Sequence, residues 1–245
     1  MEARAGSGMN DPAVAGGTPH DGVAARWDRI AAVAGLLFIV LVVASFFTPV
    51  TPDYPSTAEQ LASELTADRA GFQMALLLGF LGDIAVLVFL AGLWSRFRRY
   101  EGTGGMMSGL FAIASATFAA TVLVSEGVYL ALVQAAETAD PSTLPTLEAL
   151  DYWIGIGTVP AGVAMMIGGT GAILSTHALP TWLGYLSGLT GVLLVLSLAG
   201  VYESEEESVL VEIGGFGGFL MFMIWVLATS VVLLMRSRRH AEAMA

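Results

Sequence analysis

The sequence of 245 residues has no cysteine, no lysine and only three histidines. The missing cysteine excludes disulfides, thiolate metal sites and a cysteine nucleophile. His20, His177 and His240 all lie outside the apolar runs, which argues against an intramembrane haem or zinc site. We therefore expect no cofactor and no bound metal. Charged residues are also few, at 13%, where a soluble domain would carry about a quarter.

Apolar sequence takes the place of the missing charge. Hydrophobic residues make up 56% of the chain, and six runs are each close to the roughly 20 residues that cross a bilayer. Only helices or closed barrels satisfy their backbone hydrogen bonds in lipid, and the runs lack strict alternation. The predicted fold is therefore all-α, a polytopic membrane bundle of six transmembrane helices. The predicted spans are 30–47, 72–100, 106–135, 152–174, 182–201 and 213–235.

The segments outside the spans give the domain organisation. Small and polar residues without an apolar period open the chain, as is typical of disorder. We predict a disordered cytoplasmic tail at 1–25, a six-helix transmembrane domain at 26–238 and a short cytoplasmic tail at 239–245.

Two connections and one span carry further local signals. Segment 56–70 reads as a short surface helix with Ser56 as its N-cap, and 138–150 reads as a loop. Pro160 falls in the middle of the fourth span, where it predicts a kink.

The arginines predict the orientation. With both termini in the cytoplasm, nine of the ten arginines lie on the inner side and only Arg69 lies outside, as the positive-inside rule requires. The outer loops are then acidic, including Glu203–Glu207. We expect a multi-pass protein of the cytoplasmic (inner) membrane whose partner is the lipid bilayer, with a membrane protein or a second copy as a further partner. No basic surface away from the membrane supports nucleic-acid binding.

Two carboxylates lie well inside the apolar runs, Asp83 in the second span and Glu126 in the third. A charge at mid-membrane costs about 2.5 to 3.5 kcal/mol on insertion scales, so such residues usually face the bundle interior. We place the two acids about 18 and 13 Å below the outer span ends, depths that allow contact if the two spans are neighbours. No arginine lies at that depth, so we expect one or both acids to be protonated.

Small residues on the third span support an inward-facing Glu126. They recur at spacings of three and four and end at the carboxylate, and small residues let helices approach closely. Ser115 lies on this stripe and is the third intramembrane polar candidate. The stripe consists of Ser108, Ala112, Ser115, Ala119, Val122 and Glu126.

Two interpretations of Asp83 and Glu126 stay open. One is a proton or cation relay, or a polar anchor for a small ligand, which indicates transport or ligand binding along a polar path. The other is a protonated acid that donates one structural hydrogen bond, which is compatible with a non-catalytic accessory or interaction subunit. Serine catalysis needs a base, and no span carries histidine or lysine, so we predict no enzyme.

Glycines in GxxxG spacing predict close helix packing. The three pairs are Gly105 and Gly109, Gly184 and Gly188, and Gly214 and Gly218.

Two short runs carry a resemblance to a known group. They are Ala178-Leu179-Pro180-Thr181-Trp182-Leu183-Gly184 at the start of the fifth span, and Arg29-Ile30-Ala31 leading into Ala34-Gly35-Leu36-Leu37. With the acid in an arginine-ended second span, they resemble a broad group of bacterial six-span membrane proteins classed as a domain of unknown function. The resemblance covers residues 26–238. It implies the fold and the location and brings no established activity or catalytic residue.

Overall fold

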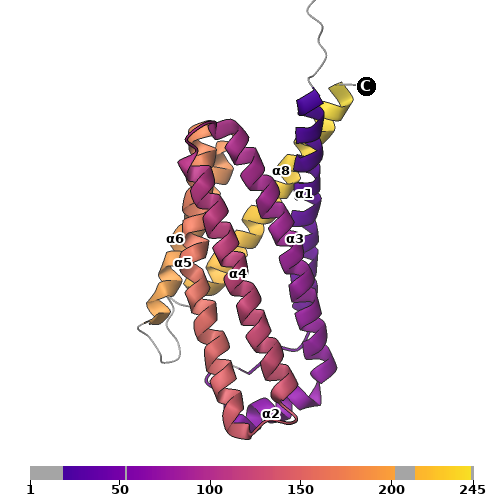
Figure 1. Cartoon of the computed structure of the whole chain (residues 1–245), viewed down its shortest axis with the longest axis vertical. Coiled ribbons are helices and arrows are strands. Elements are labelled where there is room, and N and C mark those ends of the chain that lie inside the picture. The colour runs from indigo at the N-terminus through magenta and orange to yellow at the C-terminus, as the bar shows by residue number, and fades with distance from the viewer. Residues whose placement is uncertain (1–18, 53, 202–212, 244–245) are drawn as a thin grey trace, which may run out of the picture.

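The computed structural model describes residues 19–52, 54–201 and 213–243, and all the regular elements within them are helices (Figure 1). Six of these helices are long and apolar enough to cross a membrane, so the chain is a multi-pass membrane protein and the predicted all-α bundle is confirmed. The helices are α1 (Pro19–Ser45), α2 (Ala58–Ala67), α3 (Arg69–Glu101), α4 (Met106–Ala135), α5 (Leu144–Thr176), α6 (Thr181–Ser197) and α8 (Gly218–Ala243), with short turns of helix at Pro141–Thr143, Leu198–Val201 and Ile213–Gly217.

The helices form one bundle with two distinct ends. At one end α1 begins, α8 ends and α3 finishes with Arg96, Arg98 and Arg99; we call it the arginine end (Figure 1). The opposite end carries α2 and is called the α2 end. α3, α4 and α5 pack as successive antiparallel neighbours, α1 packs on α3 and α8, and α6 packs on α5 and α8. α8 crosses the bundle diagonally from α6 to α1 (Figure 1).

Buried apolar side chains form two clusters. The larger one joins α1, α3, α4, α5, α6 and α8 and includes Phe89, Phe97, Phe111 and Trp225, each 0% exposed. The smaller one lies at the α2 end, where α2 covers the ends of α3, α4 and α5. Its members are Leu61, Leu65, Phe72, Leu76, Leu132, Val133, Ala136 and Leu144.

Helices α3 and α5 are longer than a membrane requires. Each has 33 residues, hence a length of about 50 Å, against a hydrocarbon core of about 30 Å. At the α2 end, the smaller cluster holds the ends of these two helices together. The predicted loop at 138–150 is wrong in its second half, because α5 begins at Leu144. Pro160 lies inside α5, which continues as one helix on both sides of it.

The boundaries at both termini also differ from the prediction. α1 begins at Pro19 and α8 continues to Ala243, so 19–25 and 239–243 are helical. The rest of the predicted N-terminal tail and the acidic loop at 203–207 lie outside the described residues.

The N-cap predicted at Ser56 is wrong by one residue. Thr57 Oγ1 accepts a hydrogen bond from Gln60 N at 3.2 Å, and Gln60 Oε1 accepts one from Thr57 N at 3.1 Å. This reciprocal pair is a capping box, which requires a Gln or Glu three residues after the cap. The predicted single helix at 56–70 is also two helices, since Asp68 ends α2 and caps α3 by accepting from Gly71 N at 3.1 Å.

Replacing Thr57 by alanine is expected to fray the first turn of α2. Loss of such a cap costs about 1 kcal/mol, which corresponds to an about fivefold rise in amide hydrogen exchange across that turn. Thr66→Ala is the control, because Thr66 Oγ1 bonds only to carbonyls of its own helix. Equal exchange in both variants would contradict the role of the capping box.

The connection from α4 to α5 is held by Asp140. Its Oδ1 accepts from the Ser142 hydroxyl at 2.7 Å and from Ser142 N at 2.9 Å. These hydrogen bonds favour the ionised form and lower the pKa of Asp140 below its ordinary value. The connection is therefore expected to loosen only when acid protonates this carboxylate.

Candidate functional site

Asp83 and Glu126 meet inside the bundle. Asp83 is 9% exposed and Glu126 is half-buried, and a hydrogen bond joins their side chains. One oxygen of each, Asp83 Oδ2 and Glu126 Oε2, is buried without a hydrogen-bond partner among the described residues. The structure thus brings together two acids whose depths the sequence places within reach of each other, and each acid has one oxygen free to accept a further hydrogen bond.

Gly79 makes room for this contact. It lies one helical turn before Asp83 on the same face of α3. A Cβ at Gly79 would lie only 2.4 Å from Glu126 Oε1. Without a side chain at this position, Glu126 can lie against the α3 backbone beside Asp83.

A third carboxylate, which the sequence assigns to an outer loop, belongs to the same region. Asp151 lies in the early turns of α5, where its Oδ1 accepts from Ser125 Oγ at 2.5 Å. Its charge acts on Glu126. Tyr129, one turn beyond Ser125, forms a side-chain hydrogen bond with Thr51. We call this set the carboxyl layer: Thr51, Asp83, Ser125, Glu126, Tyr129 and Asp151.

Asp83 lies near the middle of α3, as the fifteenth of its 33 residues. Fifteen residues separate Asp83 from Arg98, a distance of about 22 Å along α3. With the hydrocarbon boundary at Arg98, about 8 Å remains to the boundary at the α2 end. A boundary at Arg98 would thus give a smaller depth than the value of about 18 Å counted from the outer span end, and that depth stays a prediction.

The two faces of the carboxyl layer differ. Toward the arginine end, the fully buried rings of Phe89, Phe97 and Phe111 follow it. On the other side, the polar contacts continue outward to Thr51 in the segment after α1. The layer thus has buried aromatic rings on its arginine-end side and further polar side chains on its α2-end side.

Ser115 is not part of the carboxyl layer. It lies eleven residues before Glu126, about 16 Å away along α4. It is 6% exposed, and its hydroxyl has no partner among the described residues. Ser108 and Ala119 of the same stripe are also buried, so the stripe does face inward, but only its last member reaches the site.

The described residues contain no group of three or more His, Asp or Glu side chains placed to hold a metal ion. The carboxyl layer thus has acids in contact but no metal-ligand arrangement in this part of the chain. A proton is the simplest species that two touching carboxyl groups can hold.

The glycine pairs are right in part. A Cβ placed at Gly184 would lie 2.8 Å from the Leu174 side chain, and one placed at Gly218 would lie 2.9 Å from the Leu194 side chain. A Cβ placed at Gly214 would lie 2.3 Å from the backbone nitrogen of Ser197. These three glycines therefore serve close packing.

The other three members of the glycine pairs differ. Gly188 makes ordinary contact with Thr170 at 3.6 Å. Gly105 precedes α4 as its N-cap and meets Ser108 and Glu101 of the local turn. A Cβ at Gly109 would meet no atom of another described element within 4 Å, so Gly109 makes no close helix contact in the described part of the chain.

No family model, curated protein or solved structure matches this chain.

Proposed function

We propose that this protein is a proton-coupled transporter, which binds and releases a proton at Asp83 and Glu126. The hydrogen bond between the two carboxyl groups carries this proposal. An ionised carboxylate only accepts hydrogen bonds, so the contact requires a proton on one of the two groups. Two charged carboxylates this close would repel each other in a medium of low dielectric constant.

The surroundings favour exchange of that proton over permanent retention. The unpartnered oxygens Asp83 Oδ2 and Glu126 Oε2 can accept from an arriving water or hydronium. Asp151, which accepts from Ser125, and Tyr129, one turn farther along α4 toward the α2 end, are only half-buried. A proton bound at the pair therefore has a polar route to one side of the membrane, and transport requires the rings beyond it to move apart.

The arginine distribution supports an orientation for this route. Arg98 and Arg99 end α3, and basic residues flank transmembrane helices mainly on the cytoplasmic side. The proposal therefore places the protein in the cytoplasmic membrane with the arginine end inside. The carboxyl layer then takes its proton from the extracytoplasmic side, and the proton can leave to the cytoplasm only after the helices open at the arginine end.

Asp83→Asn is expected to abolish proton binding while keeping the shape of the side chain. In reconstituted liposomes, infrared difference spectra between neutral and acidic pH should show the carbonyl band of a protonated carboxyl in the wild type and not in this variant. Dye enclosed in the liposomes should report acidification after an outside acid pulse for the wild type only. Asp140→Asn, which removes an exposed acid outside the spans, should behave like the wild type.

Two outcomes would contradict the proposal. A band that survives in both Asp83→Asn and Glu126→Gln would place the titrating group elsewhere. A band that disappears while the dye response stays unchanged would leave Asp83 as a structural acid and favour an accessory role.

A further inference from the structure

Arg96 is a buried arginine at the arginine end. It is 5% exposed, its Nε donates to the Ala178 carbonyl oxygen at 3.0 Å, and its Nη1 donates to Asp28 Oδ2. It thereby ties α3 to α1 and to the turn between α5 and α6. His177, with φ of 54°, ends α5 in the left-handed conformation and starts this turn.

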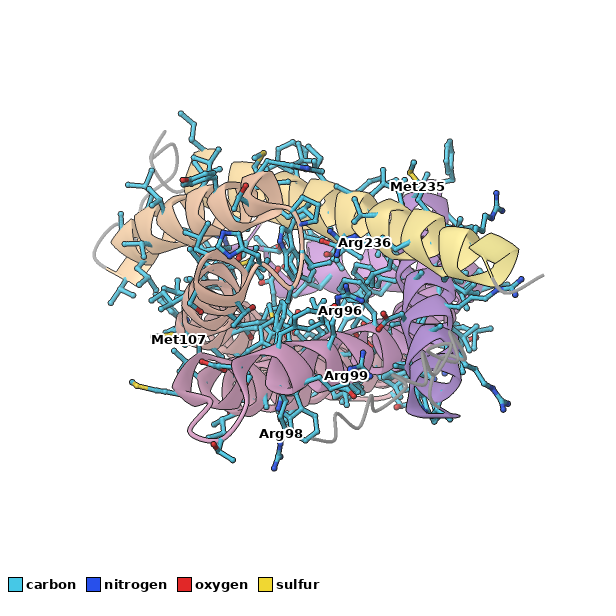
Figure 2. The ribbon with its side chains drawn as sticks, turned by 90° about the horizontal axis from the view of Figure 1, so that it is seen from above. Arg96, Arg98, Arg99, Met107, Met235 and Arg236 are labelled. Carbon is cyan, nitrogen blue, oxygen red and sulfur yellow. The ribbon has the colours of Figure 1, made fainter. Side chains whose placement is uncertain are left out.

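Two more arginines complete what we call the arginine cluster, which consists of Arg96, Arg99 and Arg236. Arg99 Nη2 donates to Asp28 Oδ1 at 2.9 Å, and Arg236 Nη1 donates to the Ala178 carbonyl oxygen at 3.0 Å. Seen from the arginine end, Arg96 and Arg236 point toward one another between α3 and α8, whereas Arg98 points away (Figure 2).

The arginine cluster has more positive than negative charge. Three guanidinium groups face one carboxylate, Asp28, and the charges of Arg96 and Arg236 repel each other. The other acid at this end with a described side chain is Glu101, which accepts from the backbone of Met107 and Ser108. An anion bound here, at the boundary of a low-dielectric region, would offset this excess of positive charge.

Most N–H donors of the three guanidinium groups have no acceptor among the described residues. Each guanidinium carries five N–H donors in a fixed fork, and the described residues accept only four hydrogen bonds from the three arginines. Such forks match the oxygens of phosphate in a bidentate way. The guanidinium groups of Arg96 on α3 and Arg236 on α8 both donate to the Ala178 carbonyl oxygen. Their remaining N–H donors therefore lie in the same region.

We propose that the arginine cluster binds a phosphate-bearing anion between α3 and α8. The shared chemistry is a phosphate group held by Arg236 and Arg99 over the buried Arg96. It can come from a phospholipid headgroup, because the cluster lies where α3 leaves the membrane, or from free phosphate. This site lies at the opposite side of the closed core from Asp83, so it does not depend on the proposed proton transport.

The test compares two probes and a matched control. The protein is kept in a maltoside detergent free of phospholipid, to which either phosphatidylglycerol or inorganic phosphate is added, and retained ligand is measured by native mass spectrometry and calorimetry. Arg236→Gln is expected to weaken binding about tenfold or more, the loss that one charge-assisted hydrogen bond implies. Arg98→Gln removes the same charge from the same end but leaves the cluster intact, and it should bind like the wild type.

Each outcome decides the proposal. One retained phosphatidylglycerol that Arg236→Gln loses identifies a lipid site, and phosphate binding without lipid retention identifies a free anion site. Equal losses in Arg98→Gln and Arg236→Gln would reduce the effect to general surface charge and overturn the proposal, as would no binding by the wild type. If Arg236→Gln does not purify in monodisperse form, Arg99→Gln takes its place, since Arg96 then still pairs with Asp28.

Discussion

Replacing Gly168 by alanine is expected to lower the free energy of unfolding by about 3 kcal/mol. A Cβ at this position of α5 would lie 2.6 Å from the backbone nitrogen of Phe111 and 2.9 Å from its Cα. A side chain could rotate away from such a clash, but the α4 backbone can yield only if the two helices separate. Phe111 would move with it, although its ring is fully buried and packs edge-to-face on Phe97 at 5.1 Å.

Gly109→Ala on α4 is the control for Gly168→Ala. A Cβ at Gly109 would meet nothing within 4 Å among the described residues outside its own turn, and alanine is favoured over glycine inside a helix by about 0.5 to 1 kcal/mol. This variant should therefore unfold at the same temperature as the wild type or slightly above it. The measurement is thermal unfolding in one detergent followed by circular dichroism. Equal midpoints for the two variants would refute the close contact between α4 and α5.

The difference between Gly109 and Gly168 shows which features of helix packing the sequence predicts and which it does not. Length and hydropathy predict six spans, because a run of about 20 apolar residues has few alternatives to crossing a membrane. Spacing predicts that Gly105 and Gly109 share a helix face, but not whether that face meets a neighbour. A close approach to the α4 backbone comes from Gly168, which belongs to none of the three GxxxG pairs.

The start of α5 was missed for a related reason. Residues 144–151 contain Pro145, Glu148 and Asp151, a composition that is typical of a loop. In the structure Pro145 lies in the first turn, where a helix tolerates proline. Glu148 Oε2 accepts from Ser56 N at 3.1 Å and Asp151 accepts from Ser125. These partners are distant in sequence, so no local pattern predicts them.

Part of the candidate site could likewise be predicted from the sequence, and part could not. Intramembrane acids stand out against an apolar background, so Asp83 and Glu126 could be found from the sequence alone. Asp151 looked like an ordinary loop acid, and Gly79 looked like one glycine among many. Their roles depend on the register between α3, α4 and α5, which the packing of the folded bundle sets.

Arg96→Gln is expected to be the most costly single substitution at the arginine end, at about 3 to 5 kcal/mol, the range for breaking a buried ion pair from one side. It leaves Asp28, whose side chain is 13% exposed, with Arg99 alone, and it leaves the Ala178 carbonyl with Arg236 alone. Arg98→Gln should cost less than about 0.5 kcal/mol, as is usual for an exposed surface charge. Unfolding in a chemical denaturant measures both.

A double substitution separates the ion pair from the size of the side chain. If the cost of Arg96→Gln comes from a buried carboxylate left short of its partner, adding Asp28→Asn removes that charge and recovers part of the lost stability. If the cost comes only from the packing of the arginine stem, the two substitutions add and the double variant is less stable than either single one. If the two losses of stability simply add, Asp28 does not hold α1 to α3 through Arg96. The excess of positive charge that favours an anion at the arginine cluster would then no longer be supported.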